Sequence, residues 1–586
     1  MNLPGPNSFP KPMKRKGKIR TAILLFLIAA AGAGAYLNSL EGEFLWDDDH
    51  FIVNNAYLRS WSYLPEIFTG DVAAGSGVSY GYYRPLATFS YLVDYTLWGL
   101  NPRGYHAAGI LYHILAAAAL FCLVGLIFRD ELLAFLTALL YVVHPVHTET
   151  VAYVSGRPDS LCALLIFLAF IMYLKFLAKG RPLRFVLMAA SFAGALLSRE
   201  SSVVLPLLLL AYHLAFRVRL RPLPFLPILL LAATYVLARW RLAAPEAGAP
   251  PLAGRVSGFL ASVPEYLRLL VLPLHLHQEY GVGGFSFPDP PVIAGAAVTA
   301  AALLLCLRLF LRGTRGEVLE ERGLAPGRVV LFSLLWFFAA LAPYSGVYPI
   351  RAYMAEHWIY VPSVGFFLTA AGGLTLLYRS RCPKAVSAGL IAALPLLFGA
   401  LTAAQNRYFR DPLTFYERTA LYSPGSARIR NNLAIEYFRA GRIDEARKQL
   451  AGAIALDPFY PEACNNLGRV YHARGEFEKA RALYLRAIRI NPGYASAYGN
   501  LGVLCVDTGE PEKGLAHFRK AAELNPLDAD AFFNLGLALR MTGKEAEAEA
   551  AFSRALRLEP AHGPARRQLT PRLRPPERQE ETGKSG

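Results

Sequence analysis

Long apolar runs alternate with short polar segments between residues 21 and 404, and runs of this length stop after Asn406. An α-helix of about 20 residues crosses the hydrocarbon core of a bilayer. The runs therefore predict eleven membrane-spanning helices, at 21–40, 105–128, 131–145, 159–178, 184–198, 201–216, 222–240, 290–311, 328–346, 356–378 and 384–404. We expect an all-α protein with a multi-span membrane domain over 21–410 and a soluble domain after it.

Basic residues concentrate in alternate loops between these runs, and this bias predicts which loops are cytoplasmic. They lie before 21, at 129, and within 175–184, 217–221, 308–315 and 379–384. A further apolar stretch, 256–276, would break the alternation if it crossed the membrane, and its internal charges and prolines make crossing costly. We expect residues 1–20 to form a basic cytoplasmic N-terminus, and the stretch 256–276 to lie at the outer interface.

The formal net charge of +17 is explained by the same distribution of basic residues. The basic residues belong to the cytoplasmic loops and to a proline-rich tail at 566–586, which we predict to be disordered. We therefore expect a lipid bilayer, and no nucleic acid, as the partner of the charged loops. An odd number of spans places the C-terminal domain on the outer side.

A 34-residue period dominates the soluble part of the chain. In-register positions of four units carry asparagine, then leucine, and later glycine and alanine; the asparagines are Asn432, Asn466, Asn500 and Asn534. This spacing resembles the tetratricopeptide repeat, an α-solenoid of paired helices. We predict a repeat domain over 411–565, with four units from about 424 to 559. The asparagines would lie in a concave groove for an extended polypeptide, and the alternative is a spacer or self-association module.

Ionisable residues cluster in the loops assigned to the outer side, where such groups are functional candidates. The first loop opens with the acidic triplet Asp47, Asp48 and Asp49. A carboxylate can deprotonate a hydroxyl, and an arginine can bind phosphate in a bidentate manner. The substrate-binding candidates on this face are Arg84, His144, His147, Glu149, Arg157, Asp159, Arg199, Glu200, Arg351 and Glu356.

Two plainer interpretations of these loops stay open. Arg157 with Asp159, and Arg199 with Glu200, are close enough in sequence to neutralise each other. His144 and His147, with Glu149 and Asp159, are compatible with a divalent metal, but Pro145 disfavours a helical ligand pair, and structural histidines are favoured. We assign no cofactor.

Five segments together resemble a known family: FLWDDDHFIVNN, YYRPLATFSYLVDYTLWGLNPRGYH, HPVHTETVAYVSGRPD, LLSRESSVVLPLLLL and AEHWIYVPSVGF. They are similar to the motif series of the transmembrane and tetratricopeptide-repeat proteins. These are GT-C-type glycosyltransferases related to protein O-mannosyltransferases. The resemblance covers about residues 20–560 and implies a GT-C-like membrane domain followed by the repeats.

The resemblance also implies an activity. The family transfers a sugar from a polyprenyl-phosphate donor to a serine or threonine hydroxyl, with inversion. Asp47 and Asp48 match the family's acidic pair, one of which would be the general base, while Asp49 is an additional acid. Glu149 and Glu200 match later acidic positions, and Arg84, Arg157, Arg199 and Arg351 are the phosphate-side candidates. The family commonly has lysine at position 199 and arginine at position 357, where this chain has Arg199 and His357.

The sequence thus predicts a membrane glycosyltransferase that moves a mannose-like sugar to a polypeptide held by the repeats. It would be a multi-pass protein of the cell (inner) membrane with extracytoplasmic repeats, or of the ER membrane with lumenal repeats in a eukaryote. The alternative is a non-catalytic, membrane-anchored scaffold for complex assembly. A transporter is disfavoured, because the charges lie in loops and not at the bilayer midplane.

Overall fold

The structure is a computed structural model, and it describes residues 15–242, 250–281, 284–312, 325–350, 352–559 and 561–569. The chain divides into two compact units, Met1–Gly425 and Ser426–Gly586. The described residues of both units form helices and loops without any β-strand. This confirms the all-α prediction.

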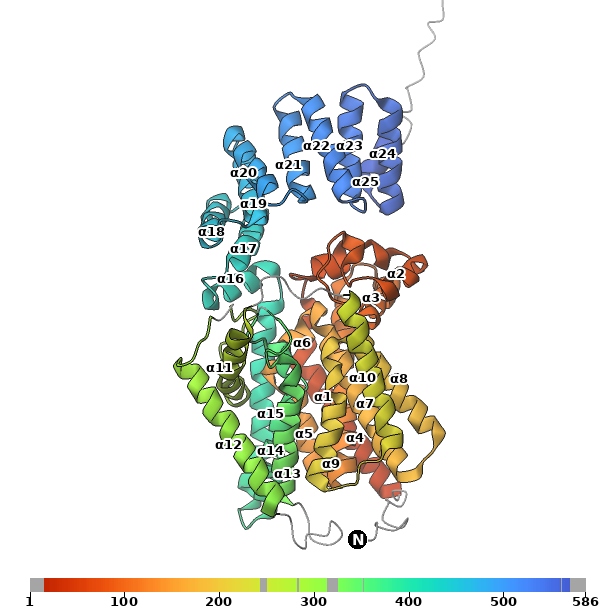
Figure 1. Cartoon of the computed structure of the whole chain (residues 1–586), viewed down its shortest axis with the longest axis vertical. Coiled ribbons are helices and arrows are strands. Elements are labelled where there is room, and N and C mark those ends of the chain that lie inside the picture. The colour runs from red at the N-terminus through yellow and green to blue at the C-terminus, as the bar shows by residue number, and fades with distance from the viewer. Residues whose placement is uncertain are drawn as a thin grey trace, which may run out of the picture. The chain divides into compact units, whose positions relative to one another are not determined.

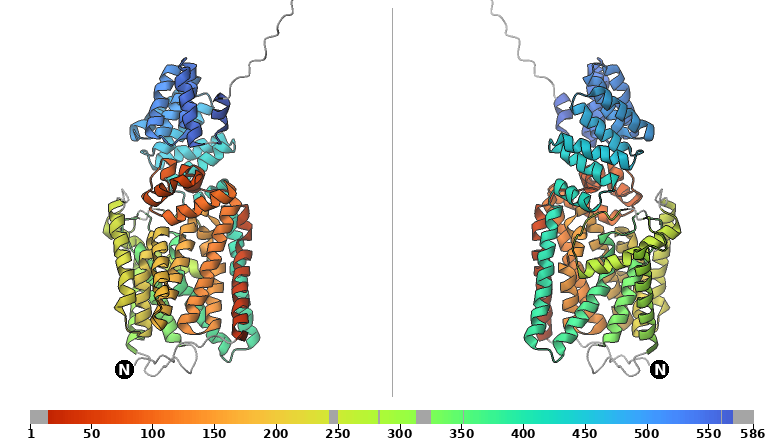
Figure 2. Two further views of the ribbon diagram at one scale, coloured as in Figure 1. Left: turned by 90° about the vertical axis from the view of Figure 1, so that its right-hand side faces the viewer. Right: turned by 90° about the vertical axis from the view of Figure 1, so that its left-hand side faces the viewer.

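The first unit is a bundle of long helices that run side by side (Figures 1 and 2). Every predicted span corresponds to one helix: α1 (Arg15–Tyr36), α4 (Pro102–Phe128), α5 (Glu131–Val143), α7 (Arg157–Lys179), α8 (Pro182–Ser198), α9 (Leu205–Phe216), α10 (Pro222–Leu242), α12 (Pro290–Arg312), α13 (Pro326–Leu341), α14 (Ser363–Arg379) and α15 (Lys384–Asn406). Buried apolar side chains from most of these helices form one continuous core.

Seven helices among the described residues are long and apolar enough to cross a membrane, or eight if one bent pair counts as a single span. The bent pair is α5 with the segment Pro145–Ala152, and its axis turns by 55°. Helix α9 has 12 residues, or about 18 Å of rise, which is short for a crossing. The protein is therefore a membrane protein, and the number of eleven spans stays a prediction.

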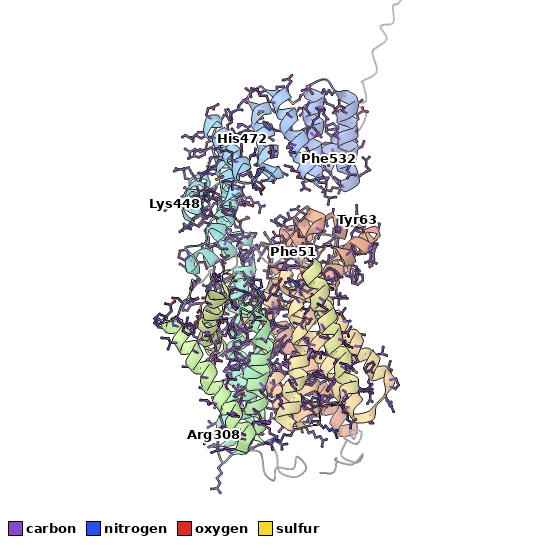
Figure 3. The ribbon with its side chains drawn as sticks, viewed as in Figure 1. Phe51, Tyr63, Arg308, Lys448, His472 and Phe532 are labelled. Atoms are coloured by element: carbon purple, nitrogen blue, oxygen red, sulfur yellow. The ribbon has the colours of Figure 1, made fainter. Side chains whose placement is uncertain are left out.

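Several basic loops lie at one end of the bundle. Arg379, the last residue of α14, forms an ion pair of 2.6 Å with Asp130, which precedes α5. Arg217, after α9, donates to the carbonyl of Phe310 near the end of α12, and Arg221 donates to Leu177 in α7. In Figure 3 this end is marked by Arg308, and the other end of the unit by Phe51.

Helix α11 (Leu252–Val271) covers most of the stretch assigned to the interface. It does not qualify as a membrane span by length and composition within the described chain. Its Tyr266 hydroxyl donates to the carbonyl of Ala355, and its Leu270 carbonyl bonds to His144. The helix is therefore packed against the loops of the end that carries Phe51.

The second unit contains the predicted repeats. Each of the four 34-residue units is a pair of antiparallel helices: α17 (Ala427–Arg439) with α18 (Ile443–Leu456), α19 (Pro461–Ala473) with α20 (Phe477–Ile490), α21 (Ala495–Asp507) with α22 (Pro511–Leu524), and α23 (Ala529–Met541) with α24 (Glu545–Leu558). The repeated glycines 441, 475, 509 and 543 all adopt positive φ angles of 73° to 80°, which suits glycine at the turn between paired helices.

Both ends of the repeat domain differ from the prediction. Helix α16 (Pro412–Tyr422) belongs to the first unit, so the boundary follows Gly425 and not residue 410. Its Phe415 ring lies 5.8 Å from the ring of Trp46, and Ser423 bonds to the carbonyl of Glu279. Helix α25 (Gly563–Leu569) includes the first residues of the predicted tail, which are therefore ordered. The rest of that tail, 570–586, lies outside the described residues.

Candidate functional site

The acidic triplet lies in a tightly folded loop. Trp46 has a φ of 48°, in the left-handed region that a bulky residue rarely adopts, and residues 49–53 form one π-helical turn. The backbone N–H of Asp47 donates to the Tyr153 hydroxyl at 3.0 Å. This bond attaches the loop to the segment between α5 and α7, which holds Tyr153. Strained backbone of this kind is frequent at functional sites.

Asp48 is completely buried in this loop. One carboxylate oxygen accepts from the backbone N–H of Leu45 at 2.9 Å. The other accepts from the backbone N–H of Ser155 at 2.8 Å and from the Ser155 hydroxyl. Burial raises the pKa of Asp48 to about 7, against these hydrogen bonds, and the neighbouring Asp47 charge adds to the increase. Asp47 and Asp49 are only partly buried.

Arg157, the first residue of α7, connects the segment between α5 and α7 to helix α3 (Pro85–Trp98). Its side chain is 1% exposed and forms an ion pair of 2.5 Å with Asp94. It also donates to the Ser90 hydroxyl and to the Tyr105 carbonyl, at 3.1 and 2.9 Å. A guanidinium enclosed in this way has a structural role, because it holds α3 and α7 together.

The other ion pairs also join different loops. Arg84 binds Glu200 in a bidentate manner, with distances of 3.0 and 2.7 Å. Arg199 binds Asp159 at 2.5 Å. The sequence left open that Arg157 pairs with Asp159 and Arg199 with Glu200. Both of these pairs are wrong, because each acid pairs with an arginine from another loop. Loops that are far apart in the sequence therefore meet at one end of the membrane unit.

The segment before α14, which holds Glu356 and His357, joins the cluster through Glu149 of the segment between α5 and α7. This carboxylate accepts from the backbone N–H of His357 at 3.0 Å and also pairs with the His357 ring. The adjacent Glu356 accepts from the backbone N–H of His277 and from the Tyr280 hydroxyl, each at 2.6 Å. His357 thus supplies the donor group expected at this position. Arg351 lies outside the described residues.

His144 and His147 take no part in this cluster. Nε2 of His144 bonds to the Leu270 carbonyl at 3.1 Å, and its ring packs on Phe398. The His147 ring lies 4.5 Å from that of Tyr141 and 4.6 Å from that of Tyr360. Both histidines are fully buried among aromatic rings, which fits structural histidines. The described residues contain no group of three or more potential ligands arranged for a metal ion.

Sequence reasoning missed Arg239 near the end of α10. Its Nη1 atom lies 3.7 Å from Glu200 and makes no hydrogen bond among the described residues. Its position at the outer end of a predicted span was visible in the sequence, but its partner was not. A small surface pocket lies at the same end, and its lining includes Arg255, Tyr344 and Trp358. The rings of Tyr344 and Trp358 stack at 4.7 Å.

The repeated asparagines form bonds between repeats. The Asn466 amide donates to Asn431 of the preceding repeat, and the Asn500 amide donates to Asn465, both at 2.9 Å. Asn432 accepts from Asn431 at 3.1 Å. Part of the asparagine series therefore holds neighbouring repeats together, and Asn534 is only partly buried.

Comparison with known proteins agrees with this division of the chain. Residues 87–240 match the family "Dolichyl-phosphate-mannose-protein mannosyltransferase", and residues 431–495 and 500–562 match "Tetratricopeptide repeat". Human "Protein O-mannosyl-transferase TMTC1" is 28% identical over 517 residues, covering 77% of this chain and 57% of the relative. The Caenorhabditis elegans "Protein O-mannosyl-transferase F38B6.6" is 26% identical, covering 78% of this chain and 66% of the relative.

A shorter match is closer in sequence. The mouse "Protein O-mannosyl-transferase TMTC1" is 41% identical over 160 residues, which is 26% of this chain and 17% of the relative. The chain thus spans less than two thirds of the length of each of these relatives. Together the matches confirm the resemblance seen in the sequence: part of the membrane domain matches a mannosyltransferase family model, the C-terminal unit matches tetratricopeptide repeats, and the similar curated proteins are named protein O-mannosyl-transferases.

Proposed function

We propose that this protein transfers a mannose-like sugar from a polyprenyl-phosphate donor to a serine or threonine hydroxyl of a polypeptide, on the outer face of a cell or ER membrane. The observation that carries the proposal is the meeting of four polar loops at one end of the membrane unit, mostly within the segment that matches a mannosyltransferase family. A donor anchored in the bilayer would present its phosphate at the level of these loops.

Asp47 is the best candidate for the general base. Both oxygens of Asp48 are occupied by N–H and O–H donors and lie away from solvent, so Asp48 is better suited to hold the loop. Asp47 is adjacent and partly exposed. Its carboxylate would take the proton of the acceptor hydroxyl, whose oxygen then attacks the anomeric carbon. The bond from that carbon to the phosphate oxygen breaks, and the lipid phosphate leaves with the electron pair.

The leaving phosphate needs cationic donors. Arg84 and Arg199 lie in the cluster with their guanidinium groups oriented by Glu200 and Asp159. Arg239 is a further candidate, because its Nη1 atom lies close to Glu200 without a hydrogen bond to it. Arg157 is too enclosed for direct contact with a ligand. The stacked rings of Tyr344 and Trp358 lie beside this cluster and would offer aromatic surface to the sugar.

The repeats are the candidate binding site for the polypeptide acceptor, since paired-helix repeats form extended concave surfaces. Asn432 and Asn534 would be its polar contacts in the first and last units. This role rests on analogy with the fold.

The proposal is tested with purified protein, a polyprenyl-phosphate mannose and a peptide rich in serine and threonine, with the product detected by mass spectrometry. Asp47→Asn should lower kcat by about 10²- to 10⁴-fold and leave the melting temperature nearly unchanged. Arg239→Gln should raise the KM for the donor by about 10- to 100-fold. Asp49→Asn is the matched control, with activity close to that of the wild-type protein. Full activity of Asp47→Asn would refute the assigned base.

The pairing of Arg84, Arg157 and Arg199 with carboxylates also suits a second function, a membrane-anchored scaffold whose charged loops are structural. A scaffold would transfer no sugar from any polyprenyl-phosphate donor, and Asp47→Asn would bind the same partner proteins as the wild-type protein. Detectable sugar transfer by the wild-type protein excludes a purely structural role.

A further inference from the structure

The first helix of each repeat lies on the concave side of the repeat domain. Within the described repeats, successive first helices contact one another, α17 with α19, α19 with α21 and α21 with α23, whereas successive second helices, such as α20 and α22, make no comparable contact. Helices of a curved stack approach most closely on its inner side, and repeat domains use that side as an extended binding surface. Side chains that the first helices direct away from their partner helices therefore line this surface.

The asparagine that recurs every 34 residues has a different environment in each of the last three repeats. In α19, Asn466 is 9% exposed, its Nδ2 donates to the preceding repeat at 2.9 Å, and its Oδ1 accepts from Arg469 at 3.5 Å. In α21, Asn500 is partly exposed, and among the described residues only its Nδ2 is engaged, in a bond of 2.9 Å to Asn465. In α23, Asn534 is partly exposed and its side chain forms no hydrogen bond with any described residue. The hydrogen-bonding capacity that is left for a ligand therefore increases from the second repeat to the fourth.

The bond from Asn500 to Asn465 fixes the orientation of the Asn500 carboxamide. Asn465 is 2% exposed, so its Oδ1 atom lies inside the stack and holds one N–H of Asn500 against the preceding repeat. The Oδ1 atom of Asn500 and its second N–H are left for a ligand. A carboxamide with one acceptor and one donor available is complementary to a peptide group, which offers one N–H and one C=O.

Apolar side chains flank both of these asparagines. Val503 lies one turn after Asn500 on α21, and Leu537 lies one turn after Asn534 on α23. Both are partly buried and pack against the core of the last two repeats. The equivalent residue of α19 is Arg469, which is engaged with Asn466. We call Asn500, Val503, Asn534 and Leu537 the carboxamide surface, and none of the four carries a charge that would select a particular side chain.

The spacing of the two asparagines sets the register of a bound chain. Helices that pack directly, as α21 and α23 do, have axes about 8–10 Å apart. An extended polypeptide rises about 3.3 Å per residue. Equivalent positions on the two helices therefore match peptide groups that are about three residues apart.

We propose that the carboxamide surface binds an extended polypeptide through its main chain, with little dependence on side-chain sequence. Asn500 and Asn534 each pair with one peptide group, and Asn465 is the positioning residue for Asn500. The inference rests on the proposed role of the repeats as the acceptor site, and it adds how the acceptor is recognised. Segments of many different sequences that contain serine or threonine would bind, provided that they are extended.

The test measures binding to the full-length protein in detergent by fluorescence anisotropy, with labelled, unstructured short peptides of unrelated sequence. The wild-type protein should bind these peptides with similar affinities, and Asn500→Ala/Asn534→Ala should weaken the binding of all of them by about 10- to 100-fold. Gln449→Ala removes a carboxamide from a second helix, α18, and is the matched control, with affinities like those of the wild-type protein. Losses confined to one peptide would overturn the proposal, because they would indicate recognition of side chains.

Ester substitution in one of these peptides removes its N–H donors one at a time. With the wild-type protein, two positions about three residues apart should each lose about 3- to 10-fold in affinity. The loss at one position should disappear in Asn500→Ala, and the loss at the other position should disappear in Asn534→Ala. A peptide without ester-sensitive positions, or losses that persist in both variants, would refute main-chain recognition.

The positioning role of Asn465 has its own measurement. Asn465→Leu leaves Asn500 without its buried partner, and should weaken peptide binding by about 3- to 10-fold. The same substitution in the Asn500→Ala background should change the affinity little. A loss of equal size in both backgrounds would reduce Asn465 to a purely structural residue. Circular dichroism checks that each variant is folded, and the ester series with the wild-type protein needs no substitution.

Sugar transfer to the same peptides is measured separately, so that failure of the proposed function and failure of this inference are distinguishable. Ester-sensitive peptide binding by a protein that transfers no sugar would refute the proposed function and support the carboxamide surface. Sugar transfer with an unchanged KM for the peptide in Asn500→Ala/Asn534→Ala would support the proposed function and overturn the carboxamide surface.

Discussion

Adjacent acids in one loop have different environments. Asp48 is buried with a pKa raised to about 7 by that burial, whereas the unfolded chain has an ordinary aspartate. The folded state therefore holds a proton that the unfolded state has lost between about pH 4 and 7, so this group's contribution to stability is largest at low pH and falls as pH rises through that window. Asp48→Asn should remove this dependence.

The measurement is the unfolding free energy of both proteins in detergent between pH 4 and 7. The wild-type value should fall relative to that of Asp48→Asn by at most about 1.4 kcal/mol per pH unit. Glu43→Gln, which changes an exposed carboxylate nearby, should follow the wild-type curve. Parallel curves for wild type and Asp48→Asn would contradict the raised pKa. The sequence of three adjacent aspartates could not reveal this difference, because the environment of Asp48 depends on contacts with Ser155 in another loop.

Arg157 and Asp94 supply a second test at the residue scale. Arg157→Met leaves Asp94 buried without its cation, and should lower the unfolding free energy by about 3–5 kcal/mol. Adding Asp94→Leu removes the orphaned charge and should recover most of that loss. Arg268→Met makes the same change at the partly exposed pair Arg268–Glu265. It should lower the unfolding free energy by only about 0–1 kcal/mol. A double variant no more stable than Arg157→Met would show that the charge pair is not the source of the loss.

At the scale of elements, close helix contacts depend on particular glycines. A Cβ atom at Gly365 of α14 would lie 2.3 Å from the Ser333 carbonyl oxygen of α13, whereas one at Gly373 of the same helix would meet nothing within 4 Å. Gly365→Ala should therefore destabilise the protein by about 1–3 kcal/mol. Gly373→Ala should stabilise it by about 0.5–1 kcal/mol, since alanine is the better helix former. Thermal unfolding in detergent would measure both, and equal effects would contradict the packing of α13 on α14.

The sequence predicted elements better than it predicted their partners. The apolar runs located the long helices of the membrane unit, because a helix surface that is buried in lipid or in protein requires the same apolar residue types. The run 131–145 was predicted as one span, but Pro145 ends α5 before the bend. The loops of the site were all identified, while the pairs Arg84–Glu200 and Arg199–Asp159 depend on which loop folds over which. Arg239 was missed because no motif surrounds it.

At the scale of the whole molecule, the apolar pattern misplaced the boundary between the two units. The runs end at 404, which suggested a boundary at 410, although the 34-residue period itself begins near Pro424. Helix α16 lies in the interval and packs on the membrane unit, where Phe415 and Tyr416 are buried and face the ring of Trp46. A repeat domain cut from the chain should therefore begin at Ser426.

A fragment of residues 426–569 should be monomeric, helical and cooperatively folded, because its four repeats and α25 bury their apolar faces against one another. A fragment of 411–569 would expose Phe415 and Tyr416, which lose their partners in the membrane unit. It should associate or aggregate at lower concentration, as exposed aromatic surface does. Size-exclusion chromatography with light scattering distinguishes the two fragments.

In the longer fragment, Phe415→Ser/Tyr416→Ser should restore the monomer. A longer fragment that is monomeric and melts at a higher temperature than the shorter one would instead place α16 with the repeats.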